Sequence, residues 1–352
     1  EAPEVAPYSI RKTYGRLLEM IEVAFSKEAP LFVLPIYYPL AYYRGKREDI
    51  DPLQEGRQKQ VVGLIRTQFL KRFESSAHAF LRSCERLLVK LLAWAQVHTE
   101  DHSIDRARLD RWRRKWAKVI GYLEQLHLEF EQDEAEAEED LISPEMLEAV
   151  ELLDRDEYDV KRMLDDVLDD LDQLAQFVEE VRRLDPKKDD KLLALVALLK
   201  KDPVLRRDKC LIFTEFADTA RYLVKELRDR GIEGVEAIDG GSKLDRGEVI
   251  RRFAPYYNNS RSAEVDDEIR LLISTDVLSE GLNLQDATRL INYDIHWNPV
   301  RLMQRIGRVD RRMNPEIEDL LVADHPEKKP LRGTVKYWNF LPPEDLNRIL
   351  TL

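Results

Sequence analysis

The sequence predicts an α/β domain with a mostly parallel sheet, preceded by a long region made only of helices. Two observations support this prediction. Up to about residue 200, apolar side chains recur every three or four positions, which is the period of amphipathic helices. After Lys201, short β-rich runs alternate with helical patterns, as they do where crossover helices join parallel strands. Ligands of such sheets bind at the carboxyl ends of the strands.

The helical region shows three long patterns. We expect one continuous helix from about Asp51 to Val97, a second from about Ile104 to Glu139 and a third from Pro144 to Leu184. Leucines and valines form a stripe along the third helix and predict a buried face. Four aspartates lie opposite that stripe and predict a solvated face, with an acidic lid that imitates nucleic acid as the alternative: Asp165, Asp166, Asp169 and Asp170.

A basic segment, residues 106–118, carries Trp112 and Trp116 one helical turn apart. Basic residues interleaved with aromatic ones can bind a nucleic-acid backbone and stack on bases. We instead expect the tryptophans to anchor the core, and the cations to form a solvated face that partly neutralises the acidic helices.

The later region is expected to hold five strands and the helices between them. The strands are predicted at 210–214, 235–238, 269–274, 290–293 and 334–339, with helices at 217–230 and 245–253. Residues 1–50 predict a short amphipathic helix near Leu18 and then an aromatic, proline-containing stretch, residues 31–43, that packs on the helices.

Composition and charge narrow the class of protein. The chain has 352 residues, of which 43% are hydrophobic and 35% charged, enough for two or three domains with cores of their own. Its net charge of −12 is local, because residues 131–180 hold 21 acidic and three basic side chains and the remainder carries +6. Such a distribution does not exclude a nucleic-acid partner.

The sequence shows no sign of a membrane or secreted protein. No apolar run approaches the roughly 18 residues that span a bilayer, and residues 1–8 lack the pattern of a signal peptide. Cys84 and Cys210 are too few for a disulfide framework. We therefore expect a cytoplasmic protein without a membrane partner.

The most informative stretch runs from residue 271 to residue 313. It passes a polar turn after a buried strand and ends with four arginines: Arg305, Arg308, Arg311 and Arg312. Arginines three positions apart share one helical face or one side of a turn, where two guanidinium groups can converge on a polyphosphate. On spacing alone, a solvated or salt-bridged arginine-rich helix is the alternative.

Five segments in a fixed order carry a family resemblance. They read LIFTEFADTARYL at 211–223, IDGGSKLDRGEVIRRF at 238–253, TDVLSEGLNL at 275–284, NYDIHWNP at 292–299 and QRIGRVDR at 304–311. With the Lys191-Leu192-Leu193 helix before them, they resemble motifs IV to VI in the second RecA-like lobe of superfamily 2 helicases. More narrowly, they resemble the Snf2 family and its bacterial branch that resembles the RNA-polymerase-associated ATPase. The match covers roughly residues 187–340.

This resemblance implies roles for particular residues in ATP hydrolysis. Phosphoryl transfer depends on positioning and charge neutralisation, so Arg308 and Arg311 are expected as arginine fingers for the γ-phosphate. Four further residues are expected to contact or orient the nucleotide: Gln304, Asp276, Gly281 and Gly307. Without the resemblance, Asp276 is more typical of a turn or a helix N-cap.

The resemblance also implies contacts with double-stranded DNA. Gly240, Gly241 and Ser242 follow a strand and precede a helix, where backbone N–H groups and a hydroxyl can bind a phosphate. Thr214 and Thr275 end strands at the same sheet edge. Such contacts read no bases, so we expect binding that is independent of sequence and falls with salt. For the glycines, an ordinary tight turn is the alternative.

One half of an ATPase site has no counterpart in the sequence. No G-x-x-x-x-G-K-[ST] loop occurs, and the acidic string 133–136 lacks the apolar strand that would precede a magnesium-binding motif. We therefore expect ATP and Mg²⁺ to be bound mainly by a first RecA-like lobe of the same protein outside this chain, with no metal ligands supplied here. This chain alone is then expected to be inactive.

The predicted organisation has three parts. Residues 1–60 form an interlobe segment, residues 61–186 a helical insertion or protrusion that can hold a protein partner, and residues 187–345 the RecA-like helicase C-terminal lobe. The predicted function is the C-terminal half of an ATP-dependent Snf2-type DNA translocase or helicase. Two alternatives are an RNA-directed or RNA-polymerase-remodelling ATPase and a non-catalytic interaction scaffold, although the intact Q-x-x-G-R-x-x-R pattern argues against the scaffold.

Overall fold

The structure divides the chain into two compact units. It is a computed structural model that describes residues 4–25, 32–100, 103–130, 152–240, 245–276, 283–296, 298–344 and 346. Residues 1–13 and 185–343 form one unit, here called the sheet lobe. Residues 14–184 and 344–352 form the other, here called the helical unit.

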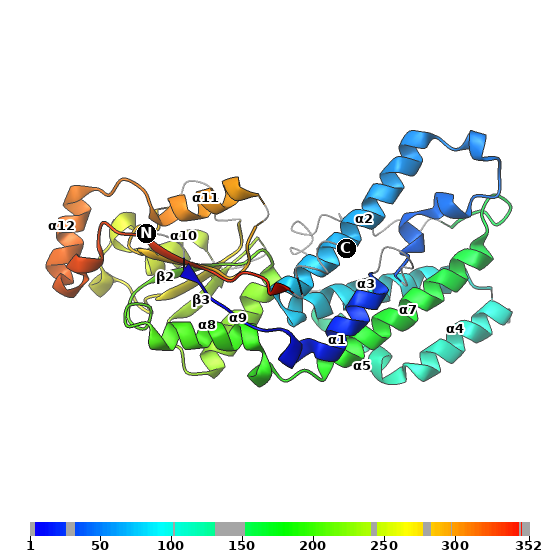
Figure 1. Cartoon of the computed structure of the whole chain (residues 1–352), viewed down its shortest axis with the longest axis horizontal. Helices are drawn as coiled ribbons and strands as arrows, with labels where there is room; N and C mark the ends of the chain where they lie inside the picture. The colour runs from blue at the N-terminus through cyan, green and yellow to red at the C-terminus, as the bar shows by residue number, and fades with distance from the viewer. Residues whose placement is uncertain are drawn as a thin grey trace. The chain divides into compact units, whose positions relative to one another are not determined.

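The sheet lobe contains a six-stranded sheet in the order β1-β6-β5-β2-β4-β3 (Figure 1). The strands are β1 (Glu4–Val5), β2 (Cys210–Phe213), β3 (Val235–Ile238), β4 (Leu271–Ser274), β5 (Arg289–Asn292) and β6 (Lys336–Asn339). Every pairing between these strands is parallel. The predicted RecA-like α/β fold, preceded by a helical region, is therefore confirmed.

Helices cover both faces of this sheet (Figure 1). Leucines of α8 (Asp190–Lys201) and α9 (Ala217–Asp229) pack on one face. Apolar residues of α10 (Arg246–Phe253) and Val309 at the end of α11 (Pro299–Val309) pack on the other. All residues of β2, β4 and β5 are buried, which explains why β2 and β4 are almost continuously apolar in sequence.

The first strand, β1, is missing from the sequence prediction. Its residues Glu4 and Val5 pair with Trp338 and Asn339 of β6. The Glu4 carboxylate accepts a 2.8 Å hydrogen bond from the Trp338 indole and lies 2.7 Å from the Lys336 ammonium. Two residues are too few to show any periodicity, so the segment is not recognisable as a strand from sequence alone.

The helical unit departs from its prediction at the helix boundaries. Its helices are α1 (Arg11–Ala24, which begins in the sheet lobe), α2 (Pro52–Ser75), α3 (Ala77–Val97), α4 (Ile104–Lys115), α5 (Ala117–Phe130) and α7 (Val160–Arg182). The continuous helix expected from Asp51 to Val97 is wrong. Ser76 is extended, and its hydroxyl accepts a 3.0 Å hydrogen bond from the Ala79 N–H, so it ends α2 and caps α3.

The other two predicted helices are also shorter than expected. Trp116 leaves helical geometry and separates α4 from α5, while residues 131–139 lie outside the described residues. The third helix begins only at Val160, where the Asp159 side chain caps it. Of the predicted start of that helix, residues 144–151 lie outside the described residues. Within the described ranges, no helix combines the length and apolar character needed to cross a membrane.

The predicted solvated face of α7 is a docking face for other segments. Asp170 is fully buried, and its carboxylate accepts hydrogen bonds from the backbone N–H groups of Val33 at 2.8 Å and Leu34 at 2.6 Å. Asp166 accepts a hydrogen bond from the Tyr42 hydroxyl at 2.6 Å. Only Asp169 is exposed among the aspartates predicted to be solvated. The prediction is wrong because the aromatic segment around residues 32–43 lies against this face.

The basic helix α4 also docks on α7. The guanidinium of Arg108 pairs with Asp165, and the Lys115 ammonium lies 2.6 Å from an Asp172 oxygen. Trp112 is buried, as expected, while the half-buried Trp116 donates a 2.8 Å hydrogen bond from its indole to Asp172. The expectation that these cations partly neutralise an acidic helix is thereby confirmed.

We expect Asp170 to make the stability of the chain depend on pH. Burial raises the pKa of this carboxyl from 3.8 to about 7, against the opposing effect of the Val33 and Leu34 amides. Between about pH 4 and about pH 7 the folded chain therefore holds a proton that the unfolded chain releases. Its contribution to the free energy of unfolding should fall as pH rises through this window, by up to roughly 1.4 kcal/mol per pH unit.

The measurement is urea unfolding of the wild-type chain and of Asp170→Asn from pH 4 to pH 7. The difference in free energy of unfolding, wild type minus variant, should decrease as pH rises, because asparagine does not titrate. Asp169→Asn on the exposed side of the same helix is the control and should change the pH profile less. A difference that stays flat or increases with pH would contradict this assignment.

Candidate functional site

Polar residues follow the ends of three neighbouring strands of the sheet, as the sequence predicts for Thr214 and Thr275. Thr214 follows β2, Thr275 and Asp276 follow β4, and Asp294 follows β5 by two residues. Since β5, β2 and β4 are adjacent and parallel, these residues gather at one edge, where open parallel sheets bind their ligands. We call this the carboxyl edge.

The helix α11 reaches this edge through local sequence signals. The Asn298 side chain accepts a 2.9 Å hydrogen bond from the Val300 N–H, and Pro299 occupies the first turn, where its missing N–H costs nothing. The helix ends at Val309, and Asp310 leaves helical geometry. Asn298 and Pro299 thus set where the arginine-bearing helix begins.

Arg305 is the centre of the carboxyl edge. Its side chain is only 2% exposed, and its Nε and Nη2 donate to the two carboxylate oxygens of Asp276 at 2.6 and 2.9 Å. Its Nη1 donates to the backbone oxygen of Asp294 at 2.8 Å. The guanidinium also lies 5.2 Å from the ring centre of Phe213 in β2. A planar fork with several donors is required to make these contacts together, which only arginine provides.

Asp294 links the strand ends to helix α8. One carboxylate oxygen lies 2.8 Å from the ammonium of Lys191, and both side chains are almost fully buried. The other oxygen accepts hydrogen bonds from the Thr214 hydroxyl at 2.5 Å and the Glu215 N–H at 3.0 Å. Through its carboxylate and its backbone oxygen, which accepts from Arg305, Asp294 connects β2, β5, α8 and α11.

The two predicted arginine fingers occupy different environments. Arg308 lies in the last turn of α11 and is 8% exposed, whereas Arg311 lies beyond the end of the helix and is exposed. The possibility that both share one helical face is therefore wrong, because the helix ends at Val309. Arg308 instead follows Arg305 by three positions and lies on its inward side.

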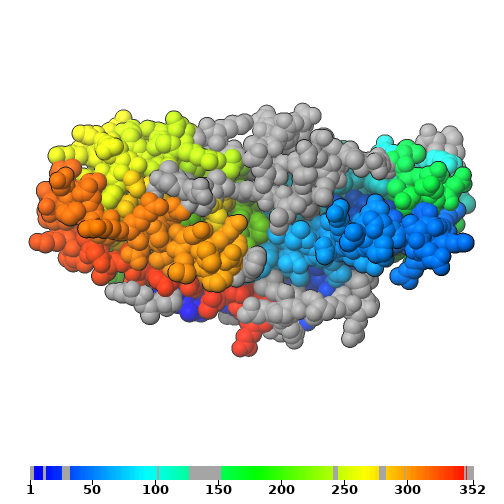
Figure 2. Space-filling model, turned by 90° about the horizontal axis from the view of Figure 1, so that it is seen from above, coloured from blue at the N-terminus to red at the C-terminus, as the bar shows by residue number. Residues whose placement is uncertain are grey.

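The other predicted nucleotide contacts lie on or near this helix. Gln304 is exposed, Gly307 is half-buried, and Asp276 serves as the carboxylate partner of Arg305. Gly281 lies outside the described residues. The outward face of α11 also carries Val300 and Met303, which are 57% and 71% exposed. Figure 2 shows this orange segment open on the surface of the sheet lobe.

The predicted nucleic-acid contacts are only partly visible. Gly240 is half-buried just after β3, whereas Gly241 and Ser242 lie outside the described residues. Thr214 and Thr275 are almost fully buried, and the Thr214 hydroxyl donates to Asp294. In this structure Thr214 therefore helps to hold Asp294 in place. A contact between Thr214 and a phosphate stays a prediction.

Sequence reasoning assigned no site role to three residues of the carboxyl edge: Lys191, Asp294 and Arg305. Each stands inside or beside a segment that carries the family resemblance, but the motif spacing points to their neighbours. Arg305 follows Gln304 directly, and Asp294 is the aspartate of NYDIHWNP. The sequence does not show that these side chains are buried, because the pattern around a buried charged residue can be the same as around an exposed one.

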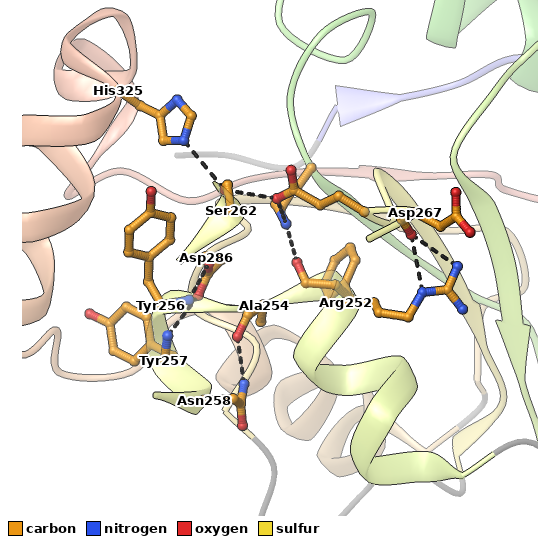
Figure 3. A network of polar contacts seen from close by, with 12 residues as sticks. Arg252, Ala254, Tyr256, Tyr257, Asn258, Ser262, Asp267, Asp286 and His325 are labelled. Atoms are coloured by element: carbon orange, nitrogen blue, oxygen red, sulfur yellow. Dashed lines mark hydrogen bonds and ion pairs between the residues drawn. The ribbon is translucent and has the colours of Figure 1, made fainter. Parts of the chain in front are cut away.

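A second polar network lies at the opposite, amino edge of the sheet (Figure 3). Asp286, which precedes β5, accepts hydrogen bonds from the backbone N–H groups of Tyr256 and Tyr257, both at 3.0 Å. The hydroxyls of these tyrosines donate to Asp324 at 2.9 Å and Glu318 at 2.7 Å, both on α12 (Pro315–Asp324). This network holds α12 on the lobe, so we assign it a structural role.

The described residues do not include a ready-made metal site. Among them, no group of three or more histidine, cysteine, aspartate or glutamate side chains is arranged to hold a metal ion. At the carboxyl edge, the carboxylates of Asp276 and Asp294 are already paired with Arg305 and Lys191. These residues are therefore poor ligands for Mg²⁺.

Comparisons with known proteins agree on the sheet lobe. The family model described as "Helicase conserved C-terminal domain" matches residues 188–313. The "Uncharacterized ATP-dependent helicase YqhH" of Bacillus subtilis is 34% identical over 142 residues, which cover 40% of this chain and 22% of the relative. The "RNA polymerase-associated protein RapA" of Sodalis glossinidius is 37% identical over 108 residues, which cover 30% of this chain and 10% of that protein.

Two solved structures align with this chain at low sequence identity. The C-terminal part of the Fun30 ATPase domain aligns with a TM-score of 0.41 and 14% identity, covering 100% of this chain and 88% of that one. The C-terminal domain of the DEAD-box protein Dbp5 aligns with a TM-score of 0.30 and 21% identity, covering 46% of this chain and 74% of the other.

We expect Arg305 to determine the stability of the sheet lobe. Arg305→Ala should lower the free energy of unfolding by about 3 kcal/mol, the lower end for a broken buried ion pair, because the carboxylate of Asp276, 18% exposed, loses its bidentate partner. Arg305→Lys should lose less, since an ammonium retains the charge but not the planar fork. Urea unfolding followed by circular dichroism measures both.

The matched control is Arg301→Ala, one turn earlier on the same helix. Its guanidinium lies 3.7 Å from Asp276 and is half exposed, so its loss should change the free energy by less than about 1 kcal/mol. Equal losses for Arg301→Ala and Arg305→Ala would show that Arg305 is not the anchor.

Proposed function

From the premise that residues 188–313 form a helicase C-terminal domain, we propose that this chain supplies one half of the nucleotide pocket of an ATP-dependent Snf2-type DNA translocase. The chain spans 22% of the length of its Bacillus relative and about a tenth of its RapA relatives. The proposal therefore concerns a longer protein, in which a first RecA-like lobe binds ATP and Mg²⁺ and this lobe completes the site.

One observation carries the proposal: α11 is anchored at the carboxyl edge by Arg305, which bridges Asp276 and Asp294. This anchor fixes the helix that bears Gln304, Gly307 and Arg308. Catalysis of phosphoryl transfer requires positive charge that is already in place when the transition state forms. A guanidinium on a helix fixed at two strand ends meets that requirement better than one on a loop.

Arg308 and Arg311 take different roles in this proposal. Arg308, held against the lobe at the end of α11, serves as the finger that neutralises charge on the γ-phosphate. Arg311, exposed just after the helix, supplies a second positive charge when the lobes close. Gln304 and Gly307 would contact or orient the nucleotide, and Gly281, which lies outside the described residues, is proposed as a further nucleotide contact.

Double-stranded DNA is the proposed track. Backbone N–H groups of Gly240, Gly241 and Ser242 would contact phosphates, and Thr214 and Thr275 are proposed as further contacts. The helical unit would act as a protrusion between the two lobes, and its acidic and basic helices are largely paired with one another through α4 and α7.

A second candidate is a polymerase-remodelling ATPase. It is favoured by the similarity to RapA proteins, whose name associates them with RNA polymerase. The two candidates differ in what stimulates ATP hydrolysis by the full-length protein: naked double-stranded DNA for the translocase, and a transcription complex for the remodelling enzyme.

We expect Arg308→Ala in the full-length protein to reduce turnover of ATP by about 10³-fold, the lower range for removal of an arginine finger. Affinity for DNA should change little, since Arg308 is not among the proposed track contacts. Steady-state ATP hydrolysis and a DNA-binding titration measure the two quantities. Arg312→Ala, an exposed neighbour outside the Q-x-x-G-R-x-x-R pattern, is the control. Equal losses of turnover and DNA binding would instead indicate a folding or track role.

We further expect DNA-stimulated ATP hydrolysis by the full-length protein and none by this chain alone. Stimulation should be similar for duplexes of different sequence, and the DNA concentration needed for half of it should rise steeply with salt. Titrations with duplex DNA, single-stranded RNA and transcription complexes distinguish the candidates. Hydrolysis by the isolated chain at an ordinary enzymatic rate would refute the two-lobe pocket, and stimulation by RNA alone would refute DNA as the track.

A further inference from the structure

Lys191 lies on α8, outside the arginine helix and the strand ends, yet its ammonium is buried at the carboxyl edge. The Nζ atom lies 2.8 Å from an Asp294 oxygen, with the two side chains 5% and 4% exposed. The aromatic ring centre of Tyr293 lies 4.2 Å from the ammonium, and that of Tyr8 lies 5.5 Å away. The ammonium thus has the carboxylate of Asp294 and the rings of Tyr293 and Tyr8 among its neighbours.

Stability alone does not explain such an arrangement. Removing an ammonium and a carboxylate from water costs much of the attraction gained between them, so a buried ion pair contributes little net stability compared with apolar residues. Its well-supported use is to fix one geometry among several. The two rings add cation–π attraction and limit the positions that the ammonium can take.

The contacts of Asp294 show what this geometry controls. Its carboxylate is fixed by Lys191 from one side, and by the Thr214 hydroxyl and the Glu215 N–H from the other. Its backbone oxygen accepts the 2.8 Å hydrogen bond from Arg305. A shift of Asp294 would therefore move the acceptor that anchors α11.

We propose that Lys191 is a positioning residue for ATP hydrolysis: it fixes Asp294, which fixes Arg305 and so the helix that carries Arg308. The inference rests on the proposed function, because it assumes that Arg308 reaches the nucleotide. It adds a residue outside α11 to that site, acting through direct contacts. Small displacements of a catalytic group are costly, since an error of about 1 Å can reduce a rate about 100-fold.

The test is a double-mutant cycle between Lys191→Met and Arg308→Ala in the full-length protein with DNA bound. The readout is affinity for ADP with aluminium fluoride, which imitates the phosphoryl group in transfer, compared with affinity for ADP alone. This ratio isolates interactions made with the transition state and stays measurable in variants that hydrolyse ATP too slowly to assay. Thermal unfolding of each variant is recorded alongside.

We expect Lys191→Met to weaken binding of ADP with aluminium fluoride by about 10-fold to 100-fold and to leave binding of ADP within about twofold. In the Arg308→Ala background, Lys191→Met should not weaken binding of ADP with aluminium fluoride any further, because residues that act through one another give non-additive effects. Lys201→Met, at the exposed end of the same helix, is the matched control and should leave both affinities unchanged.

Two results would overturn the inference while the proposed function stands. One is an unchanged affinity of Lys191→Met for ADP with aluminium fluoride. The other is that Lys191→Met loses the same affinity in the wild-type and Arg308→Ala backgrounds. If Lys191→Met does not fold, Lys191→Gln replaces it, because the glutamine amide can still donate a hydrogen bond to Asp294 without carrying a charge. The same non-additivity with Arg308→Ala is expected. Unchanged affinity in Arg308→Ala would contradict the proposed function itself, so the two failures are distinguishable.

Discussion

The sheet lobe depends on the pairing of one buried guanidinium with two strand ends. Arg305 donates hydrogen bonds to the carboxylate of Asp276 after β4 and to the backbone oxygen of Asp294 after β5. The Asp276 carboxylate in turn neutralises the charge of the guanidinium. Since β2 lies between these strands, the three contacts tie the central strands and α11 into one rigid element. Under the proposed function, this anchor would supply the preorganised positive charge that phosphoryl transfer requires.

Much of this lobe could be predicted from sequence, because the signals are local. Alternation of apolar runs and helical patterns predicted the parallel sheet, and polar residues at strand ends predicted that Thr214 and Thr275 would share an edge. The same reasoning overlooked Arg305 and Lys191, which contribute through burial. A β1 strand of two residues was also missed, since pairing with β6 rather than its own pattern makes it a strand.

Prediction was less successful in the helical unit, for the opposite reason. The apolar period continues across Ser76, so a single capping hydroxyl decides that α2 and α3 are separate helices. Asp170 was expected in solvent because it lies opposite the leucine stripe of its own helix. Its partners, Val33 and Leu34, are more than 130 residues away in sequence, and Leu34 adopts a left-handed conformation. Contacts at such separation leave no trace in helical periodicity.

The two-residue strand β1 has a practical consequence for work with the sheet lobe. A recombinant lobe that starts at residue 185 would leave the backbone N–H and C=O groups of β6 uncovered along an outer edge, and such edges recruit strands from other chains and promote aggregation. Supplying residues 4–8, in the same polypeptide or as a free peptide, would close that edge through Glu4 and its partners Trp338 and Lys336. The lobe thereby offers an attachment point for a labelled peptide by strand addition.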